Sequence, residues 1–484
     1  MNQISSFSAL MLLSSVQLIA TEKKPNIILI LADDMSAKEL SIYGNKEHKT
    51  PNIDQLAIEG THFSTCWGAA VSSPARAMLL TGKYAYQTGW YDVRSTPKGD
   101  EPNALLFKQN TLISKIAKQA GYTTAMSGKW QMGGGDPTKD WMFDEWSLPY
   151  KYLPWTGAVC PDSFVLAGQV PMYWGGPFGA NGKPMKTTQQ DFTEDLHNAF
   201  MLDFITRHKE VPFFYYWTTN LPHVSWEYEH RNPEDKTKDG KVWDWKYVEM
   251  PKRNASGNQL YNPDGTKQKT AGTLKTNIEY LDYEVGKLVR KLKELEIYEN
   301  TIIIFTADNA TTGWKGSIVE EHGPRVPLIV RGPGIVRKKE PQPMLVDFTD
   351  LIPTFAQIMG AQLPTTEKFD GTSFQPALKG EAFTGRDWIH TNHSRYSMFR
   401  LSNWILDGHN TLWYCAQKRN HNYEKTSYEK DESSKTAMRQ FKILSAKLPG
   451  LDTASVSYKR IKKYNENYKS VKEIENRTSH LDAP

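Results

Sequence analysis

Acidic and amide side chains stand directly after two apolar runs of the sequence. The run 26–32 ends in Asp33 and Asp34, and the run 301–307 ends in Asp308 and Asn309. Such continuous runs are typical of strands buried on both faces of a parallel sheet, whose carboxyl ends share one edge. Three carboxylates at one edge repel one another unless a cation lies among them, and hard oxygen ligands favour Ca²⁺ or Mg²⁺ over zinc. A single Asp-Asp pair more often caps a helix or turn, but the matching pair favours a metal site.

A hydroxyl group precedes a predicted helix in SSPARAMLLTG, residues 72–82. Pro74 suits the first turn of that helix, which places Ser72 just ahead of it. Unpaired backbone N–H groups and the positive end of the helix dipole point there and favour an anion. Arg76, one turn later, is placed to clamp anion oxygens or to orient a nucleophile. Taken alone, the motif is equally explained by a serine that only caps the helix.

Strands and helices alternate along most of the chain. Strands are expected at 26–32, 212–220 and 301–307, and helices at 51–59, 111–120 and 275–295. This alternation predicts an α/β fold, a large domain with a mostly parallel central sheet flanked by helices. The stretches 131–190 and 226–272 lack periodicity and are expected to be surface insertions.

The pattern changes near residues 370–385. Short segments that suit antiparallel strands follow, and they predict a smaller C-terminal domain with a short antiparallel sheet. We therefore expect a catalytic α/β domain over 21–375 and an α+β subdomain over 376–484.

The first twenty residues are apolar and rich in serine. They predict a signal peptide over 1–20, and hence a periplasmic or secreted protein, while no later segment has the length of a membrane span. The net charge of +5 is mild and the basic residues are scattered, so no nucleic-acid partner is expected. Cys66, Cys160 and Cys415 are too few and too far apart for a disulfide framework.

Several motifs together resemble the sulfatase family. SSPARAMLLTG is similar to its signature, a Cys or Ser followed by x-Pro-x-Arg and then Leu and Thr-Gly. Further matching segments, over roughly 24–410, are PNIILILADD, TPNIDQLAIEGTHF, SGKW, NLPHVSW, FTADN and KGSIVEEHGPRVPLIVRGPG. The resemblance implies an enzyme of the alkaline-phosphatase superfamily that hydrolyses sulfate esters.

The resemblance also implies a modified nucleophile. In the family the first residue of the signature is oxidised to formylglycine, so Ser72 would be the serine-type version, matured by a bacterial partner enzyme. One hydroxyl of the aldehyde hydrate attacks sulfur, and the other loses its proton as sulfate is eliminated. An unmodified serine would form a sulfate ester that is hard to clear.

Further site residues follow from the resemblance alone. It implies Ca²⁺ in preference to Mg²⁺, held by Asp33, Asp34, Asp308 and Asn309. Arg76 would orient the nucleophile, and Asp308 could also take its proton. Lys129 and Lys315 would bind sulfate oxygens in the transition state, and His223 would protonate the leaving alcohol. Outside this pattern, a lone Lys is usually a surface charge and a lone His is usually structural.

The sequence departs from the family at Gln131. The family usually has His two residues after the lysine of SGKW, where this chain has SGKWQ. Gln can hydrogen-bond but cannot carry a proton near neutral pH. Either Gln131 only positions the hydrate, or another base such as His223 or Asp308 serves, or activity is reduced.

The substrate is expected to be a sulfated carbohydrate, because the chain resembles exported bacterial sulfatases and is rich in aromatic residues. Candidate substrate contacts are Trp90, Tyr91, Asp92 and Arg94 just after the signature, the insertion around 141–180, and the segment 390–396 with His390 and His393. They could equally be ordinary residues without that role.

Two alternatives remain open. One is a phosphate or phosphonate monoester hydrolase of the same superfamily that uses unmodified Ser72. The other is an inactive sulfate-binding homologue, motivated by Gln131.

Overall fold

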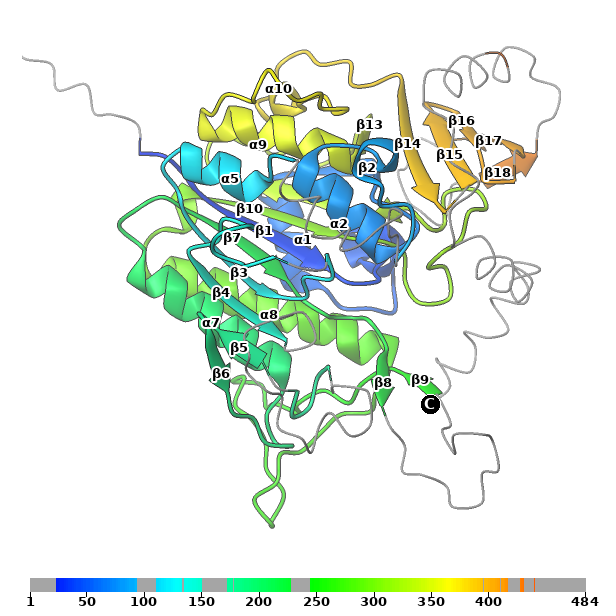
Figure 1. Cartoon of the computed structure of the whole chain (residues 1–484). Coiled ribbons are helices and arrows are strands. Elements are labelled where there is room, and N and C mark those ends of the chain that lie inside the picture. The colour runs from blue at the N-terminus through cyan, green and yellow to red at the C-terminus, as the bar shows by residue number, and fades with distance from the viewer. Residues whose placement is uncertain are drawn as a thin grey trace, which may run out of the picture.

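One large sheet runs through the middle of the molecule, with helices on both faces (Figure 1). The computed structural model describes residues 23–93, 110–132, 135–149, 172–176, 178–227, 244–394, 396–409, 411–416, 427–430 and 439. The strand order is β11-β2-β12-β10-β1-β7-β3-β4-β5-β6, and β13 pairs with β2. The strands are β1 (Asn26–Ala32), β2 (Thr61–Trp67), β3 (Thr123–Gly128), β4 (Glu145–Pro149), β5 (Phe178–Ala180), β6 (Lys183–Met185), β7 (Phe213–Thr218), β10 (Thr301–Ala307), β11 (Arg325–Val326), β12 (Leu328–Arg331) and β13 (Gln342–Asp347).

The centre of this sheet is parallel. Strands β10, β1, β7, β3 and β4 lie side by side and run in the same direction. Every residue of β1, β7 and β10 is buried, as expected for strands covered on both faces. Ala32 lies opposite Ala307, and Gly128 lies opposite Thr218, so these strands end at the same edge.

Two groups of helices cover the sheet (Figure 1). On one face lie α1 (Pro51–Ile58), α7 (Thr193–Arg207) and α8 (Leu274–Glu294), and on the other lie α2 (Ser72–Thr81), α5 (Ile113–Gln119) and α9 (Leu351–Met359). In α8, buried Ile278, Leu281, Val285, Leu288 and Leu292 recur every three or four residues and form its apolar face. The short helices are α3 (Ala85–Thr88) and α10 (Gln375–Leu378).

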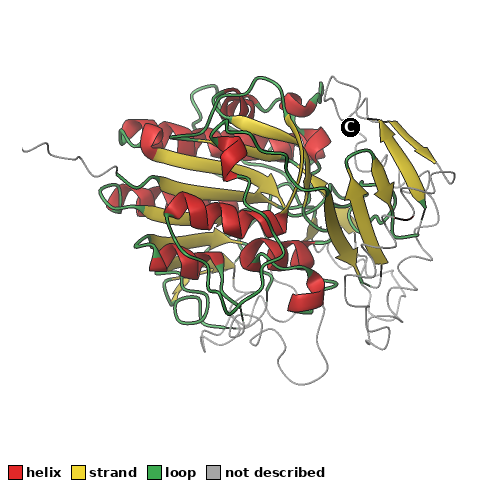
Figure 2. Cartoon of the chain, turned by 90° about the horizontal axis from the view of Figure 1, so that it is seen from above, coloured by secondary structure: helices red, strands yellow, loops and turns green. Residues whose placement is uncertain are grey.

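A second sheet of five antiparallel strands lies beside the β2 and β13 side of the large sheet (Figure 2). We call it the small sheet: β14 (Trp388–His393), β15 (Tyr396–Leu401), β16 (Trp404–Leu406), β17 (Leu412–Ala416) and β18 (Ser427–Lys430). Its apolar residues Ile389, Met398 and Ile405 share a core with Trp67 and Leu345 of the large sheet. Elsewhere β8 (Ser225–Glu227) pairs with β9 (Asp244–Lys246).

The structure confirms the predicted fold class, and it also differs from the predictions in detail. The insertion expected over 131–190 contributes β4, β5 and β6 to the large sheet. Ser72 is the first residue of α2 rather than the residue ahead of it. Thr50 precedes α1, and its hydroxyl contacts Ser41 and Asp54 instead of capping the helix.

The structure does not test the predictions of a signal peptide and of the domain limits. The proposed signal peptide and Cys160 lie outside the described residues. The domain limits near residue 375 stay a prediction, and Cys66 and Cys415 are buried free thiols. Within the described part of the chain, no helix is both long and apolar enough to cross a bilayer.

Gly128, at the end of β3, generates a testable prediction. Its φ is +98°, and a Cβ placed there would lie 2.0 Å from the carbonyl oxygen of Thr218. Gly128→Ala should lower the free energy of unfolding by about 3 kcal/mol or more, because left-handed strain adds to overpacking. Urea unfolding measures the loss.

Gly121 provides the matched control. Its φ is +81°, yet nothing lies within 4 Å of a Cβ built there. Gly121→Ala should therefore cost only the backbone strain, about 1–2 kcal/mol. Equal losses in the two variants would contradict the close approach of β3 to β7.

Candidate active site

Charged and polar side chains gather at the carboxyl ends of four neighbouring strands. Asp33 and Asp34 follow β1, Asp308 and Asn309 follow β10, and Lys129 follows β3. The segment after β7 carries His223, Ser72 opens α2, and Lys315 lies on the loop after β10. With Arg76 of α2, these nine residues are called the strand-tip cluster below.

Ser72 is fully buried within this cluster. Its hydroxyl donates to Asn309 Oδ1 at 2.9 Å and lies 3.4 Å from Asp33 Oδ1. Lys129 Nζ is 3.5 Å from the same hydroxyl. The structure therefore brings position 72 against both predicted strand tips.

Each predicted lysine is paired with one aspartate. Lys129 Nζ donates to both oxygens of Asp33, at 2.7 and 2.6 Å. Lys315 Nζ lies 2.8 and 2.9 Å from the oxygens of Asp34. The Lys129 side chain is 2% exposed and that of Lys315 is 22% exposed, so the cluster is reached by solvent on the Lys315 side.

Arg76 contacts partners other than Ser72. Its Nε and one terminal nitrogen donate to Asp308 Oδ2, at 3.1 and 2.7 Å, and the other donates to the carbonyl oxygen of Lys129 and to Thr218 Oγ1. The guanidinium therefore ties three strand ends together. Its predicted role in orienting the nucleophile would act through these groups.

Asp34 has a left-handed backbone, with φ at +59°. Its N–H donates to Asp308 Oδ1 at 3.1 Å, and its Oδ1 accepts from Asn309 Nδ2 at 2.7 Å. A non-glycine residue in this region costs free energy and persists where its surroundings hold it. Here the tips of β1 and β10 hold it by direct contacts.

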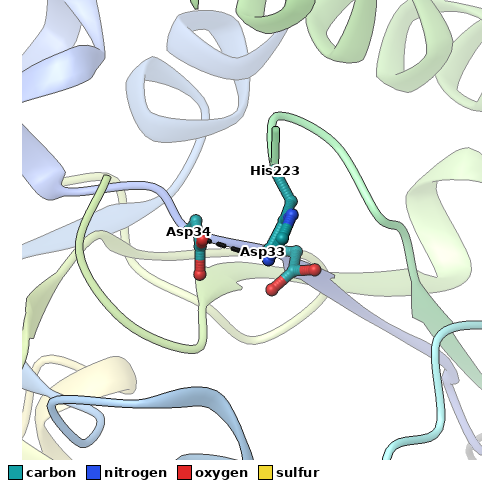
Figure 3. A group of neighbouring side chains, drawn as sticks. All are labelled: Asp33, Asp34 and His223. Carbon is teal, nitrogen blue, oxygen red and sulfur yellow. Dashed lines mark ion pairs between the residues drawn. The ribbon is translucent and has the colours of Figure 1, made fainter. Parts of the chain in front are cut away.

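His223 presents Nε2 to the cluster. Its Nδ1 hydrogen-bonds with the carbonyl oxygen of Val224, while Nε2 lies 3.1 Å from Lys315 Nζ. Nε2 also lies 3.4 Å from Asp34 Oδ2 (Figure 3). The backbone around it is held by Tyr173, whose hydroxyl contacts the carbonyl oxygens of Asn220 and His223 at 2.7 and 2.6 Å.

Burial and neighbouring charge shift the pKa values in opposite ways. Burial raises the pKa of Asp33, but Lys129, His223 and Arg76 together outweigh it and hold that pKa below its usual value. For Asp34, His223 and Lys315 likewise overcome burial and lower the pKa. Burial lowers the pKa of His223, so its neutral form is favoured at pH 7.

The donor set fits a hard divalent cation. One ligand atom from each of Asp33, Asp34 and His223 lies within 4.8 Å of the others (Figure 3). Carboxylate oxygens are the ligands that Ca²⁺ and Mg²⁺ prefer. Asn309 directs Oδ1 at Ser72, and both oxygens of each of the three aspartates are paired with donors. Asp33 and Asp34 are the two predicted ligands whose oxygens belong to this group of neighbouring ligand atoms.

Three further predicted residues lie in different settings. Gln131 has a φ of +55° and a buried Oε1 with no hydrogen-bond partner among the residues that the structure describes. Trp90 is 5% exposed and belongs to the main hydrophobic core. His393 is buried, and its Nδ1 lies 2.9 Å from the carbonyl oxygen of Gly316. Their contacts with a substrate stay predictions, and Arg94 lies outside the described residues.

Sequence reasoning missed two supporting residues. Thr218 joins Arg76 to the carbonyl oxygen of Lys129, and buried Glu194 accepts from Thr219 Oγ1 and Asn220 Nδ2, both at 2.6 Å. Glu194 thereby holds the segment that carries His223. The polar WTTN ending of a buried strand was a signal for Thr218, whereas Glu194 is remote in sequence.

Comparison with known proteins decides the family. A family model described as Sulfatase matches residues 25–361, which is more than half of the chain. The chain belongs to the sulfatase family. Its members hydrolyse sulfate esters, and this chain is a sulfuric ester hydrolase by that membership.

The individual relatives share about a quarter of their residues with this chain. An N-acetylglucosamine-6-O-sulfatase from Bacteroides thetaiotaomicron is 26% identical over 456 residues, which cover 77% of this chain and 74% of that protein. An N-acetylgalactosamine-6-sulfatase from Canis lupus familiaris is 28% identical over 393 residues, covering 75% and 67%. The crystal structure of Ps i-CgsB in complex with k-i-k-neocarrahexaose has a TM-score of 0.64 and 25% identity, covering 93% of this sulfatase and 100% of that chain.

The Arg76–Asp308 pair generates a stability prediction for this sulfatase. Both side chains are fully buried, so Arg76→Leu would leave Asp308 without its cation. The free energy of unfolding should fall by about 3–5 kcal/mol, measured by urea unfolding. As a control, Arg207 pairs with Glu145 from a side chain that is 44% exposed, and Arg207→Leu should cost at most about 1 kcal/mol. Similar losses would contradict the importance of the buried pair.

Proposed function

We propose that this sulfatase removes sulfate esters from carbohydrates, such as sulfated glycan or polysaccharide fragments, with formylglycine at position 72 and a bound Ca²⁺. The observation that carries the proposal is the position of Ser72, whose hydroxyl lies within 3.5 Å of Asp33, Lys129 and Asn309. The carbohydrate substrate is supported by the names of the relatives, two of which are amino-sugar sulfatases.

The two lysines are the proposed sulfate-binding groups. Lys129 pairs with Asp33, and Lys315 pairs with Asp34. Once a metal ion neutralises these carboxylates, the two ammonium groups can bind sulfate oxygens instead. Charge supports this exchange, because the three carboxylates of Asp33, Asp34 and Asp308 balance Lys129, Lys315 and Arg76. A dication, a sulfate ester monoanion and a deprotonated attacking hydroxyl together add no net charge, so that balance is kept.

The cation would be held by Asp33 and Asp34, with Asp308 and Asn309 beside them, and would polarise a sulfate oxygen and lower the pKa of the attacking hydroxyl. Formylglycine hydrate would supply that hydroxyl and a second one through which sulfate leaves. Arg76 would hold the Asp308 carboxylate in place, since it donates twice to Asp308 Oδ2. Gln131 would position the hydrate, because it cannot carry a proton.

His223 would protonate the leaving alcohol. Because Nδ1 is committed to the carbonyl oxygen of Val224, Nε2 is the nitrogen that faces the cluster. A proton on Nε2 would be released readily, since burial favours the neutral ring. We further propose that residues 1–20 direct export to the periplasm or beyond, and that a maturation enzyme oxidises Ser72.

Mass spectrometry of the peptide that contains Ser72 tests the proposal. Protein made together with a serine-type maturation enzyme should show the loss of two hydrogens at position 72 and release sulfate from members of a panel of sulfated saccharides. Ser72→Ala should lower kcat/KM by at least about 10³-fold, because the nucleophile is removed. Ser73→Ala, the neighbouring serine, should keep both the modification and the activity.

Two outcomes would contradict the proposal. An intact Ser72 in fully active, natively expressed protein that cleaves phosphate monoesters would favour an unmodified nucleophile. Binding of the sulfated saccharides by fully matured protein without any release of sulfate would favour an inactive homologue.

Calcium should stabilise the folded protein. At a free concentration about 100 times its Kd, a ligand that binds only the folded state raises the free energy of unfolding by about 2.7 kcal/mol. Thermal unfolding in EDTA and in Ca²⁺ measures the effect. Asp34→Asn should abolish it, whereas Asp264→Asn, a change at an exposed loop carboxylate, should keep it. An equal rise in Asp34→Asn would exclude Asp34 as a ligand.

A further inference from the structure

The loop that carries Lys315 is attached to the small sheet at three points. We call residues 310–323 the Lys315 loop. His393 Nδ1 at the end of β14 lies 2.9 Å from the carbonyl oxygen of Gly316, the residue after Lys315. The N–H of Gly408 donates to the carbonyl oxygen of Ile318 at 2.8 Å. Arg400 of β15 lies 3.4 Å from Glu321.

Gly316 is held from two sides. Its N–H donates to the carbonyl oxygen of Ala70 at 2.7 Å, two residues before Ser72, and its own carbonyl oxygen faces His393. The φ of Gly316 is +79°, a conformation that suits glycine. The backbone beside Lys315 therefore lies between the segment that leads to Ser72 and the end of β14.

The other end of the loop is fixed by buried charge and apolar packing. Glu321 is fully buried and accepts from Trp67 Nε1 at 3.0 Å and from Arg325 at 2.8 Å. Ile318 packs in the core of the small sheet. These contacts fix residues 316–321 of the loop relative to β2 and the small sheet.

We propose that the small sheet positions the sulfate-binding lysine, and that His393 is the positioning residue that acts on Lys315 through the carbonyl oxygen of Gly316. This inference rests on the proposed function, in which Lys315 binds sulfate. It assigns His393 a role different from the substrate contact expected from sequence. His393 is buried, and its Nδ1–H donates to the loop.

The length and flexibility of the lysine side chain explain why Lys315 needs a fixed backbone. Lysine has a long flexible side chain, so its ammonium is placed accurately only where its backbone is fixed. A displacement of about 1 Å in a reacting group can cost about 10²-fold in rate. Loss of the His393 contact frees the carbonyl oxygen of Gly316 and lets the Lys315 loop shift.

A double-mutant cycle tests the inference. On a sulfated saccharide or aryl sulfate, Lys315→Ala should lower kcat/KM by about 10²–10³-fold and His393→Ala by about 10-fold. The double variant should be no slower than Lys315→Ala alone, because His393 acts through Lys315. If the two losses multiply, His393 acts independently of Lys315 and the inference is wrong.

Conservative variants separate positioning from folding. His393→Asn keeps an amide N–H near the place of Nδ1 and should stay within about threefold of the parent. His393→Gln places its amide one carbon farther out and should resemble His393→Ala. Asn392→Ala is the control, because Asn392 bonds to Ser397 within the small sheet, and it should leave kcat/KM unchanged. Equal rates for His393→Asn and His393→Gln would overturn the inference.

Hydrogen exchange separates this inference from the proposed function. Amides 314–318 should exchange faster in His393→Ala than in the parent and His393→Asn, whether or not the protein hydrolyses sulfate esters. Inactivity with this exchange pattern would reject the proposed function and retain the structural coupling. Activity with unchanged exchange and unchanged rates would reject the positioning role of His393 alone.

Discussion

Parallel pairing of β10, β1, β7 and β3 is the constraint on which the site depends. Ala32 lies opposite Ala307, and Leu31 and Gly128 both lie opposite Thr218, so the four strands stop together. Each strand then delivers its next residues to one edge. The register of the sheet thus brings residues from distant parts of the chain to one edge, where side-chain contacts such as Arg76–Asp308 and Ser72–Asn309 join them.

That arrangement concentrates charge where water is scarce. Asp33, Asp308 and Arg76 are fully buried, and ions removed from water cost several kcal/mol each unless they are paired. Pairing removes much of that cost, as the Lys129–Asp33 and Arg76–Asp308 contacts show. In proteins, replacing a buried ion pair by well-packed apolar residues is often neutral or stabilising, so catalysis accounts for the six charges better than stability does.

The residues that sequence reasoning singled out fall into two groups. Asp33, Asp34, Asp308 and Asn309 follow long apolar runs, so local pattern alone placed them at one edge of a sheet. Ser72 and the residues Lys129, His223 and Lys315 were singled out through the resemblance to the sulfatase family. Strands β5 and β6 have three residues each, too few to show a period, and their edge pairing is set by the rest of the sheet. The roles of Glu194 and Thr218 could not be predicted from the sequence, because they arise only from tertiary contacts.

Lys129 and Lys315 differ in the same way: the sheet fixes the backbone of one, and tertiary contacts of a loop fix the backbone of the other. Lys129 directly follows β3, its N–H donates to the carbonyl oxygen of Thr218 at 2.6 Å, and the sheet itself fixes its backbone. Lys315 stands eight residues beyond the end of β10, on a loop that the large sheet alone does not hold. A catalytic group at that distance needs a second scaffold, and β14 and β15 reach the loop through His393 and Arg400. The small sheet thus supplies for Lys315 the rigidity that strand β3 supplies for Lys129.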